Sequence, residues 1–366
     1  MAEPTAPQNE PSESEAPLAG AETEAEPEAV PEWTQNVRIG GGAIIYYYQP
    51  LEGDAKNNVS VFFANLLLDG RWGAFGLHIE PRFRDSKLRP FFDGPAWLQE
   101  AYGSFTYQPV TLKVGKVYKQ LGLFWDSSFY GNVQVYDGLK LDPNYGVSLE
   151  GSAGDKLGAD FSAQYFVVDG GTNVSLQGRD TISIAGARRR NGFTGRIEPF
   201  FVFGPSDAGQ VRAGVSAELL TADLPGEESR VRRVAGHGKL TYDTKTHGVV
   251  GVWGEYLHQD GNHVTGFPVV GDPDATPPLP GQASGNNDYL LAGGEYSFWR
   301  LSARYNVSRV RYEDVDVEET LHVPALGVRL DDHLRVLAEY VLWTRDTSSG
   351  TVDVDRSLNV TFHGSF

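Results

Sequence analysis

Hydrophobic and polar residues alternate along most of this chain from Trp33 onward. The alternation is regular in the two segments 211–219 and 301–308 and again in the last segment, 353–366. Residues at alternate positions of a β-strand point to opposite faces, so this pattern predicts strands with one apolar and one polar face. In the first of these segments the apolar set is Val211, Ala213, Val215, Ala217 and Leu219, and the polar set is Arg212, Gly214, Ser216 and Glu218.

The same pattern predicts sixteen strands and their topology. The expected strands are 37–50, 59–69, 72–84, 95–108, 110–123, 144–153, 156–168, 188–203, 210–222, 230–243, 247–258, 288–299, 300–312, 319–330, 333–345 and 353–366. Connections between them alternate between short turns, such as Asp69-Gly70, and longer loops, such as 124–143 and 259–287. Strict alternation of connection lengths is typical of an even-stranded antiparallel meander. A two-layer sandwich has no reason to keep all short turns at one end.

A sheet of sixteen strands closes into a barrel with a wet interior, so the polar faces are expected inside and the apolar faces outside. A soluble sandwich explains any one amphipathic strand equally well, but it explains sixteen poorly. Aromatic residues near both strand ends fit two membrane interfaces. They are Trp33, Tyr107, Phe201, Phe203, Tyr242, Phe298, Trp299 and Phe366 at the turn end, and Tyr46 to Tyr48, Phe62, Phe124, Trp125, Phe166, Tyr256, Tyr312 and Trp343 at the loop end.

Composition narrows the possible functions. The 366 residues include no cysteine, which excludes disulfides and thiolate chemistry. Net charge is −17. Residues 1–36 contain nine glutamates and no lysine or arginine, so the remainder has 39 acidic against 31 basic residues. An acidic body argues against nucleic acid as a partner. The longest apolar runs, such as 59–68, are far shorter than the roughly 18 residues that a membrane-spanning helix needs.

The first 32 residues form a separate segment of mainly alanine, glutamate, proline, serine and threonine. Such a segment buries too little apolar surface to offset its ordering entropy, so disorder is expected on the periplasmic side. A periplasmic helix or a cell-wall-associated arm is the alternative. The start has no basic and apolar signal-peptide regions, so we expect the given chain to lack its signal peptide. The domain prediction is 1–32 disordered and 33–366 barrel.

Two stretches carry a resemblance to a known family. The chain ends on Phe366 in an alternating strand that also contains Phe362, which resembles the closing strand and assembly signal of bacterial outer-membrane barrels. The stretch 112–122, Leu-Lys-Val-Gly-Lys-Val-Tyr-Lys-Gln-Leu-Gly, resembles part of the phosphate-selective porins. The layout of 37–366 is similar to the sixteen-stranded porin superfamily. This resemblance implies an all-β fold, a transmembrane antiparallel up-and-down β-barrel in the bacterial outer membrane. It also implies lipid, lipopolysaccharide and the barrel-assembly machinery as partners, and a homotrimer as the oligomer.

In that superfamily the third loop folds inward and narrows the pore. Here the corresponding loop follows the fifth strand and is rich in aromatic residues, so the resemblance implies that it enters the barrel. The expected constriction residues are Asp126, Tyr130, Asp137, Lys140 and Asp142. The chain shows no continuous arginine ladder with a triple-lysine girdle, which argues against phosphate specificity.

Charged residues on the polar parity are the candidate pore wall. The cations are Arg82, Lys113, Arg196, Arg212, Arg233, Lys239, Arg304 and Arg335, and the interleaved acids are Glu80, Glu198, Glu218, Glu255, Glu295 and Glu339. Rows of arginine or lysine favour anions, so a slight anion preference is expected. Pairing across neighbouring strands is the structural alternative for each residue. The basic runs 188–190 and 230–233 either draw anions toward the pore or pair with lipid and loop acids.

Three rival functions remain. The eight histidines have no Gly-x-Ser-x-Gly stretch or His-x-x-x-His spacing near them, so we predict no catalytic residues, no cofactor and no metal site. The acidic loops 269–275 and 313–319 lack the order of a calcium loop. A plugged structural or adhesive barrel, a barrel enzyme and a soluble lectin-like sandwich are the alternatives to a passive channel for small ions and hydrophilic solutes.

Overall fold

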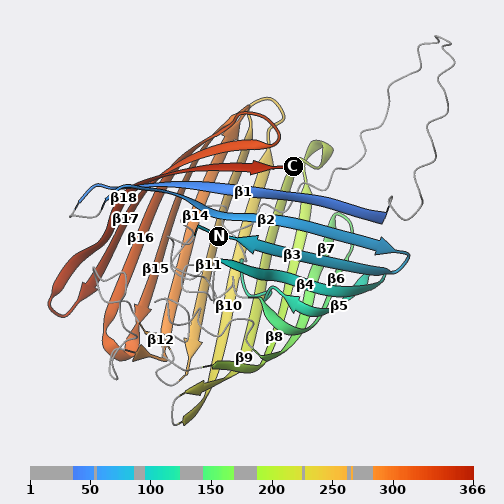
Figure 1. Cartoon of the computed structure of the whole chain (residues 1–366), viewed down its shortest axis with the longest axis horizontal. Coiled ribbons are helices and arrows are strands. Elements are labelled where there is room, and N and C mark those ends of the chain that lie inside the picture. Colours follow the sequence, from blue (N-terminus) through green and yellow to red (C-terminus); the bar gives the residue numbers. More distant parts are fainter. Residues whose placement is uncertain are drawn as a thin grey trace.

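The computed structural model describes residues 36–52, 56–85, 95–123, 143–168, 188–224, 227–261, 265–266 and 283–366. Its main feature is one closed antiparallel barrel of sixteen strands (Figure 1). The barrel strands are β1 (Val37–Pro50), β2 (Asn58–Trp72), β3 (Phe75–Phe83), β4 (Ala96–Tyr107), β5 (Val110–Val117), β6 (Asn144–Ala153), β7 (Leu157–Val168), β8 (Arg188–Phe203), β9 (Gly209–Leu224), β10 (Glu227–Asp243), β11 (Val249–Asp260), β14 (Asn287–Phe298), β15 (Leu301–Tyr312), β16 (Val317–Arg329), β17 (Leu334–Thr347) and β18 (Gly350–Ser365). The two-residue strands β12 (Thr265–Gly266) and β13 (Ala283–Ser284) pair separately.

The sixteen predicted strands are confirmed, with boundaries within three residues for fifteen of them. The exception is the segment 110–123, where the strand ends at Val117 because the following residues turn away from the wall. Among the described residues, no helix is long and apolar enough to cross a membrane. The predicted disorder of 1–32 concerns residues outside the described part of the chain.

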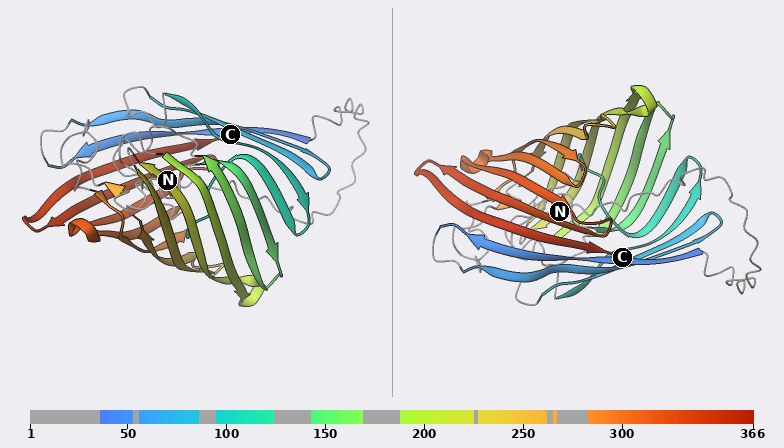
Figure 2. Two further views of the ribbon diagram at one scale, coloured as in Figure 1. Left: turned by 90° about the horizontal axis from the view of Figure 1, so that it is seen from below. Right: turned by 90° about the horizontal axis from the view of Figure 1, so that it is seen from above.

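The barrel closes where the first strand pairs with the last (Figure 2). The backbone of Phe366 exchanges hydrogen bonds with Gly41, at N–O distances of 3.0 and 3.2 Å. A Cβ at Gly41 would overlap the Asn65 carbonyl and the Phe366 ring, and one at Gly42 would overlap the Gly364 carbonyl. The glycine-rich start of β1 therefore fits the close approach of its own neighbouring strands and of the chain end.

The two faces of the wall differ as the alternation predicted. On β9 the apolar side chains of Val215 and Leu219 are exposed on the outside, at 58% and 54%, while Ser216 and Glu218 are buried inside. The outer face carries exposed apolar side chains on strands all around the barrel. Because lipid solvates apolar and not polar side chains, this surface is suited to a bilayer.

The aromatic predictions hold for most residues at one end and fail in part at the other. At the turn end, Tyr107, Phe201, Tyr242, Phe298, Trp299 and Phe366 are exposed, Phe203 is half-buried, and Trp33 lies outside the described part of the chain. At the loop end, Tyr256 is exposed, whereas Phe166, Tyr312 and Trp343 are buried. Tyr46 and Tyr48 also turn inward, where their hydroxyls donate to Asn359 at 2.9 Å and Asp355 at 3.1 Å. These five residues were wrongly assigned to the lipid-facing belt. A position near the end of a strand places a side chain close to the membrane interface, but it does not decide whether the side chain points outward or into the barrel.

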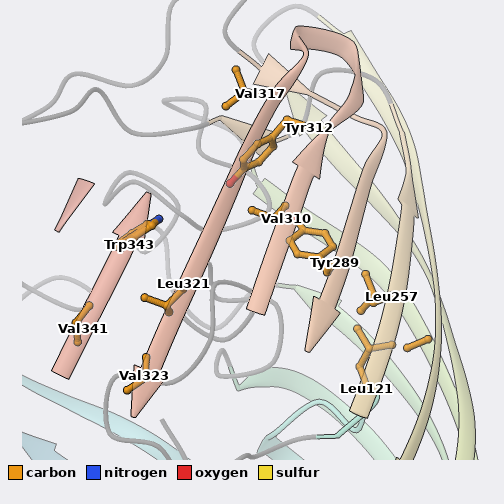
Figure 3. Close-up of a cluster of buried hydrophobic side chains, with 11 residues drawn as sticks. Leu121, Leu257, Tyr289, Val310, Tyr312, Val317, Leu321, Val323, Val341 and Trp343 are labelled. Carbon is orange, nitrogen blue, oxygen red and sulfur yellow. The ribbon is translucent and has the colours of Figure 1, made fainter. Parts of the chain in front are cut away.

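An apolar cluster on the inside of the wall was not predicted (Figure 3). It lies near the loop end of β10 to β17 and includes Leu257, Tyr289, Leu321, Val341 and Trp343, all buried. The alternation does not predict this cluster, because its residues occupy inward-pointing positions, which are polar elsewhere on the same strands. Part of the barrel interior is therefore dry.

Candidate functional site: the charged inner wall

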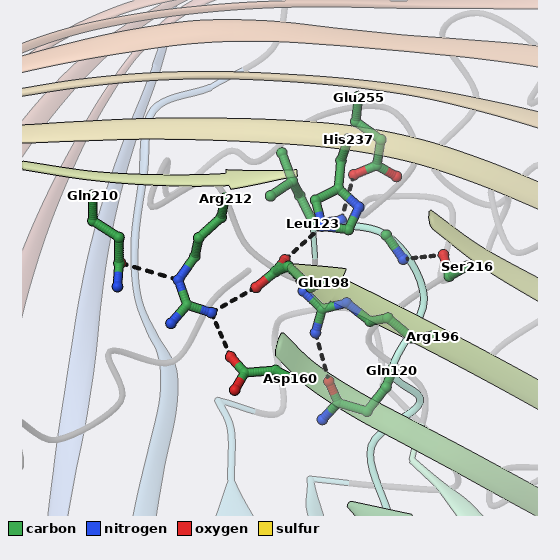
Figure 4. A network of polar contacts seen from close by, with 11 residues as sticks. Gln120, Leu123, Asp160, Arg196, Glu198, Gln210, Arg212, Ser216, His237 and Glu255 are labelled. Atoms are coloured by element: carbon green, nitrogen blue, oxygen red, sulfur yellow. Dashed lines mark hydrogen bonds and ion pairs between the residues drawn. The ribbon is translucent and has the colours of Figure 1, made fainter. Parts of the chain in front are cut away.

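Residues 118–123, here called the crossing segment, leave the end of β5 and run across the barrel interior. The backbone N–H of Gln120 donates to Gln164 on β7 at 2.7 Å, that of Gly122 to Ser216 on β9 at 2.8 Å, and that of Leu123 to Glu255 on β11 at 2.7 Å (Figure 4). Figure 4 shows the partners Ser216 and Glu255 but not Gln164. The three partners lie on successive parts of the wall from β7 to β11. The chain at the base of the third loop is therefore fixed inside the barrel.

Local sequence explains how the segment makes this crossing. Gly122 has a positive φ of 60°, and a Cβ there would overlap the Glu255 carboxylate. Leu121 is fully buried and packs into the apolar cluster of the inner wall. Leu121 thus holds the segment by burial, while Gly122 permits the turn that brings the backbone against Glu255.

A buried group of charges lies beside the crossing segment. Lys119 from the segment and Arg233 from β10 both pair with Glu218 on β9; the Lys119 Nζ to Glu218 Oε1 distance is 3.1 Å. Arg233 also donates from Nε to Gln259 at 2.9 Å. All three charged side chains are at most 3% exposed. Sequence analysis identified Arg233 and Glu218 as wall residues but missed Lys119. The predicted strand 110–123 contained Lys119, whereas the observed strand β5 ends at Val117, two residues before it.

A second charged network covers the inner wall of β7 to β10 (Figure 4). Glu198 accepts from Arg196 at 2.5 Å and from Arg212 at 2.7 Å, and it contacts His237 Nε2 at 2.5 Å. Arg212 also pairs with Asp160 at 2.5 Å, and Arg196 donates to Gln120 of the crossing segment at 3.3 Å. Asp160 and His237 were missed, although both share the inward parity of their strands.

Three more predicted cations are also paired. Arg82 binds Glu80 at 2.5 Å, Lys113 binds Glu150 at 2.7 Å and Arg304 binds Glu295 at 2.7 Å. A further buried pair, Arg345 with Glu319 at 2.5 Å, was not predicted. Six of the eight predicted wall cations are thus paired. Cross-strand pairing, the structural alternative, describes four of them, Lys113, Arg212, Arg233 and Arg304, whereas Arg82 and Arg196 pair with an acid of their own strand.

Lys239 and Arg335 differ from the other predicted cations, because neither makes an ion pair among the described residues. Lys239 is exposed, and it occupies one of the β10 positions whose side chains point into the barrel. Arg335 keeps a buried Nη2 atom without a hydrogen-bond partner in the described part of the chain. Glu339, the remaining predicted acid, is fully buried on β17.

Other predicted residues are placed differently. The constriction residues Asp126, Tyr130, Asp137, Lys140 and Asp142 lie outside the described part of the chain. Of the basic runs, Arg190 pairs with Glu228 at 2.6 Å. Arg230 and Arg232 are exposed on the parity opposite to the buried Arg233.

The turn end carries exposed charges outside the spanning segments. Lys156 donates to Asp207 at 2.8 Å, and this bond raises the pKa of Lys156. The backbone N–H of Lys245 donates to Asp243, the last residue of β10, at 2.7 Å. Neither pair contacts the inner wall networks.

The inner wall as a whole presents fixed charges of both signs to the barrel interior. Such a surface can solvate and orient small polar or charged solutes. One described group of three potential metal ligands, His78, Glu80 and Glu100, also lies on this wall.

No protein-family model matches this chain, and no curated protein matches its sequence. The solved structures do contain similar folds. The outer membrane channel DcaP of Acinetobacter baumannii aligns with a TM-score of 0.60 and 14% identity, over 90% of this chain and 97% of that one. OmpF of Salmonella typhi, solved in complex with daunomycin, aligns with a TM-score of 0.58 and 15% identity, over 90% and 98%.

An anion-selective porin from Comamonas acidovorans also aligns, with a TM-score of 0.55 and 9% identity, over 90% of this chain and 99% of that one. At these identities the shared property is the fold. The chain has the fold of the sixteen-stranded porins of the bacterial outer membrane, as its sequence resemblance implied.

Proposed function

We propose that this protein is an outer-membrane porin, a passive diffusion channel for small hydrophilic solutes without turnover chemistry. The single observation that supports this most is the closed barrel with apolar side chains outside and charged networks inside. An outward apolar band and an inward polar face are what a membrane-spanning channel requires. The proposal includes lipid and lipopolysaccharide as surroundings, assembly by the barrel-assembly machinery and a homotrimer.

The third loop is proposed to narrow this channel. The crossing segment supports this idea because it carries the chain inside the barrel directly before the predicted constriction residues. The charged networks of β8 to β10 face that segment. Solutes would pass between the loop and this wall.

A mild anion preference is proposed as well. Six predicted cations are neutralised by carboxylates, whereas Lys239 and Arg335 have no ion pair among the described residues. Pore cations that make no ion pair raise the local concentration of anions. The preference therefore depends on these two residues rather than on the whole set of cations.

Planar-bilayer recording tests the proposal in two steps. Single-channel current steps are expected from the purified protein, and the reversal potential across a KCl gradient should indicate chloride preference. The double variant Lys239→Gln/Arg335→Gln should move the reversal potential toward the cation side, whereas Lys156→Gln at an exposed turn should leave it unchanged. Cation preference in the wild type contradicts the anion proposal but leaves the channel proposal intact.

A plugged structural barrel is the second candidate. The buried apolar cluster inside the wall favours it, because apolar side chains that are fully buried in a barrel interior are covered by other parts of the chain. Absence of current steps from correctly folded protein would support this candidate over an open channel.

A further inference from the structure

Three side chains on the inner wall of β3 and β4 place metal-ligating atoms together. His78 and Glu80 are on β3, and Glu100 is on β4. One ligand atom from each lies within 4.8 Å of the other two. The group is outside the charged networks of β7 to β10, and of its three residues only Glu80 belongs to the predicted pore wall.

The imidazole of His78 is oriented by its surroundings. Its Nδ1 lies 2.6 Å from Asp69 Oδ1 on β2, and its ring stacks on Tyr102 at a centroid distance of 5.0 Å. A carboxylate accepts only from a protonated nitrogen, so the neutral ring carries its proton on Nδ1 and a lone pair on Nε2. This Asp–His arrangement is the one that orients histidine ligands in metal sites.

The free end of that imidazole faces carboxylate oxygens. Nε2 is buried and has no hydrogen-bond partner among the described residues, and it lies 3.9 Å from Glu100 Oε2. Glu100 uses its other oxygen to accept the backbone N–H of Tyr118 at 3.1 Å, and Glu80 uses Oε1 to accept from Asn65 at 3.1 Å and from Arg82 at 2.5 Å. Both carboxylates are thus held in place by bonds to one oxygen.

Electron-rich atoms so close together favour a positive charge between them, and Arg82 binds Oε1 of Glu80. Lys113 on the neighbouring β5 is engaged by Glu150 at 2.7 Å. A bound cation satisfies Nε2 and both carboxylates at once, with ligand distances of about 2.0–2.2 Å after small side-chain adjustments. An imidazole ligand favours zinc and similar transition metals over magnesium and calcium, which prefer oxygen alone.

We propose that His78, Glu80 and Glu100 form a binding site for a divalent transition-metal cation of the zinc class on the inner wall, with Asp69 as the residue that positions His78. Glu100 also holds the first residue of the crossing segment through Tyr118 N–H. The site is therefore placed at the base of the third loop.

Calorimetric titration of the folded, metal-stripped and untagged protein with zinc chloride tests this proposal. One zinc ion per chain is expected, with magnesium binding far more weakly. His78→Asn and Glu100→Gln should each abolish the site, and Asp69→Asn should weaken zinc binding by about 10–100-fold, as second-shell changes do. The matched control is His258→Asn, which removes another Asp-paired histidine, bonded to Asp288 at 2.8 Å.

Cobalt absorption gives an independent readout that does not depend on the variants folding equally well. Cobalt bound to the wild type should give visible bands typical of a nitrogen and oxygen ligand set, and zinc should displace them. The proposal is wrong if the wild type binds no zinc, if His78→Asn binds zinc as His258→Asn does, or if magnesium binds as tightly as zinc. His78 would then be an imidazolium that pairs only with Asp69 and Glu100.

Discussion

Substitution of Glu218 by glutamine tests whether the buried charges beside the crossing segment stabilise the barrel. Glu218 pairs with both Arg233 and Lys119, and all three side chains are at most 3% exposed. Glutamine keeps the shape of the side chain but removes its negative charge. Two buried cations would then face a neutral amide, with Lys119 and Arg233 left close together.

The expected cost follows from this burial. Removal of one partner from a buried pair destabilises a protein by about 3–5 kcal/mol, because the remaining charge is left uncompensated. Since water can relieve part of this penalty inside a barrel, we expect about 3 kcal/mol for Glu218→Gln. This value corresponds to a change of roughly 150-fold in the folding equilibrium constant.

Equilibrium unfolding in guanidinium, followed by tryptophan fluorescence of the vesicle-embedded protein, measures the effect. Glu228→Gln is the matched control, because its bond with Arg190 joins side chains that are 55% and 42% exposed. Exposed pairs contribute about 0–1 kcal/mol, so this variant should resemble the wild type. Adding Lys119→Met to Glu218→Gln should recover at least about 1 kcal/mol by removing one of the two buried cations that faced Glu218. A loss below 1 kcal/mol for Glu218→Gln, or equal losses for the two glutamine variants, would refute the reasoning.

Three further predictions use the same protein preparations. Gly115→Ala should lower the free energy of unfolding by about 1–3 kcal/mol, because Gly115 has a φ of 143° and a Cβ there would overlap the neighbouring strand. Its control is Gly236→Ala, where a Cβ meets open space, and this variant should be nearly neutral in the unfolding assay. Val215→Arg places a charge on the lipid-facing side near mid-strand and should cost about 2–4 kcal/mol; a neutral result would mean that this face does not meet lipid. Phe366→Ala should lower the amount of folded barrel in the outer membrane several-fold, as heat-modifiable gel mobility can show. Tyr107→Ala at another exposed turn-end aromatic should not, and equal effects would argue against an assembly signal at the chain end.

The barrel itself could be predicted from the sequence in detail. Alternation depends only on neighbouring residues, and a strand fixes the face of each side chain with a period of two. The outward position of Val215, the inward position of Glu218 and the alternating turns and loops therefore followed from the printed residues alone. The resemblance of the last strand, with Phe362 and Phe366, to the closing strand of outer-membrane barrels added the expectation that the sheet closes into a barrel. The pairing of β1 with β18 confirms this expectation.

Partners across the barrel could be decided only by the tertiary structure. Lys119 meets Glu218, and Leu123 meets Glu255, although 99 and 132 residues separate them in the chain. The parity of a strand says that a side chain points inward, but it does not say which part of the wall the side chain will face. For the same reason no strand pattern indicates that Trp343 belongs to a buried interior cluster together with Leu121. These contacts depend on the register of closure and on the path of residues 118–123, which no local pattern encodes.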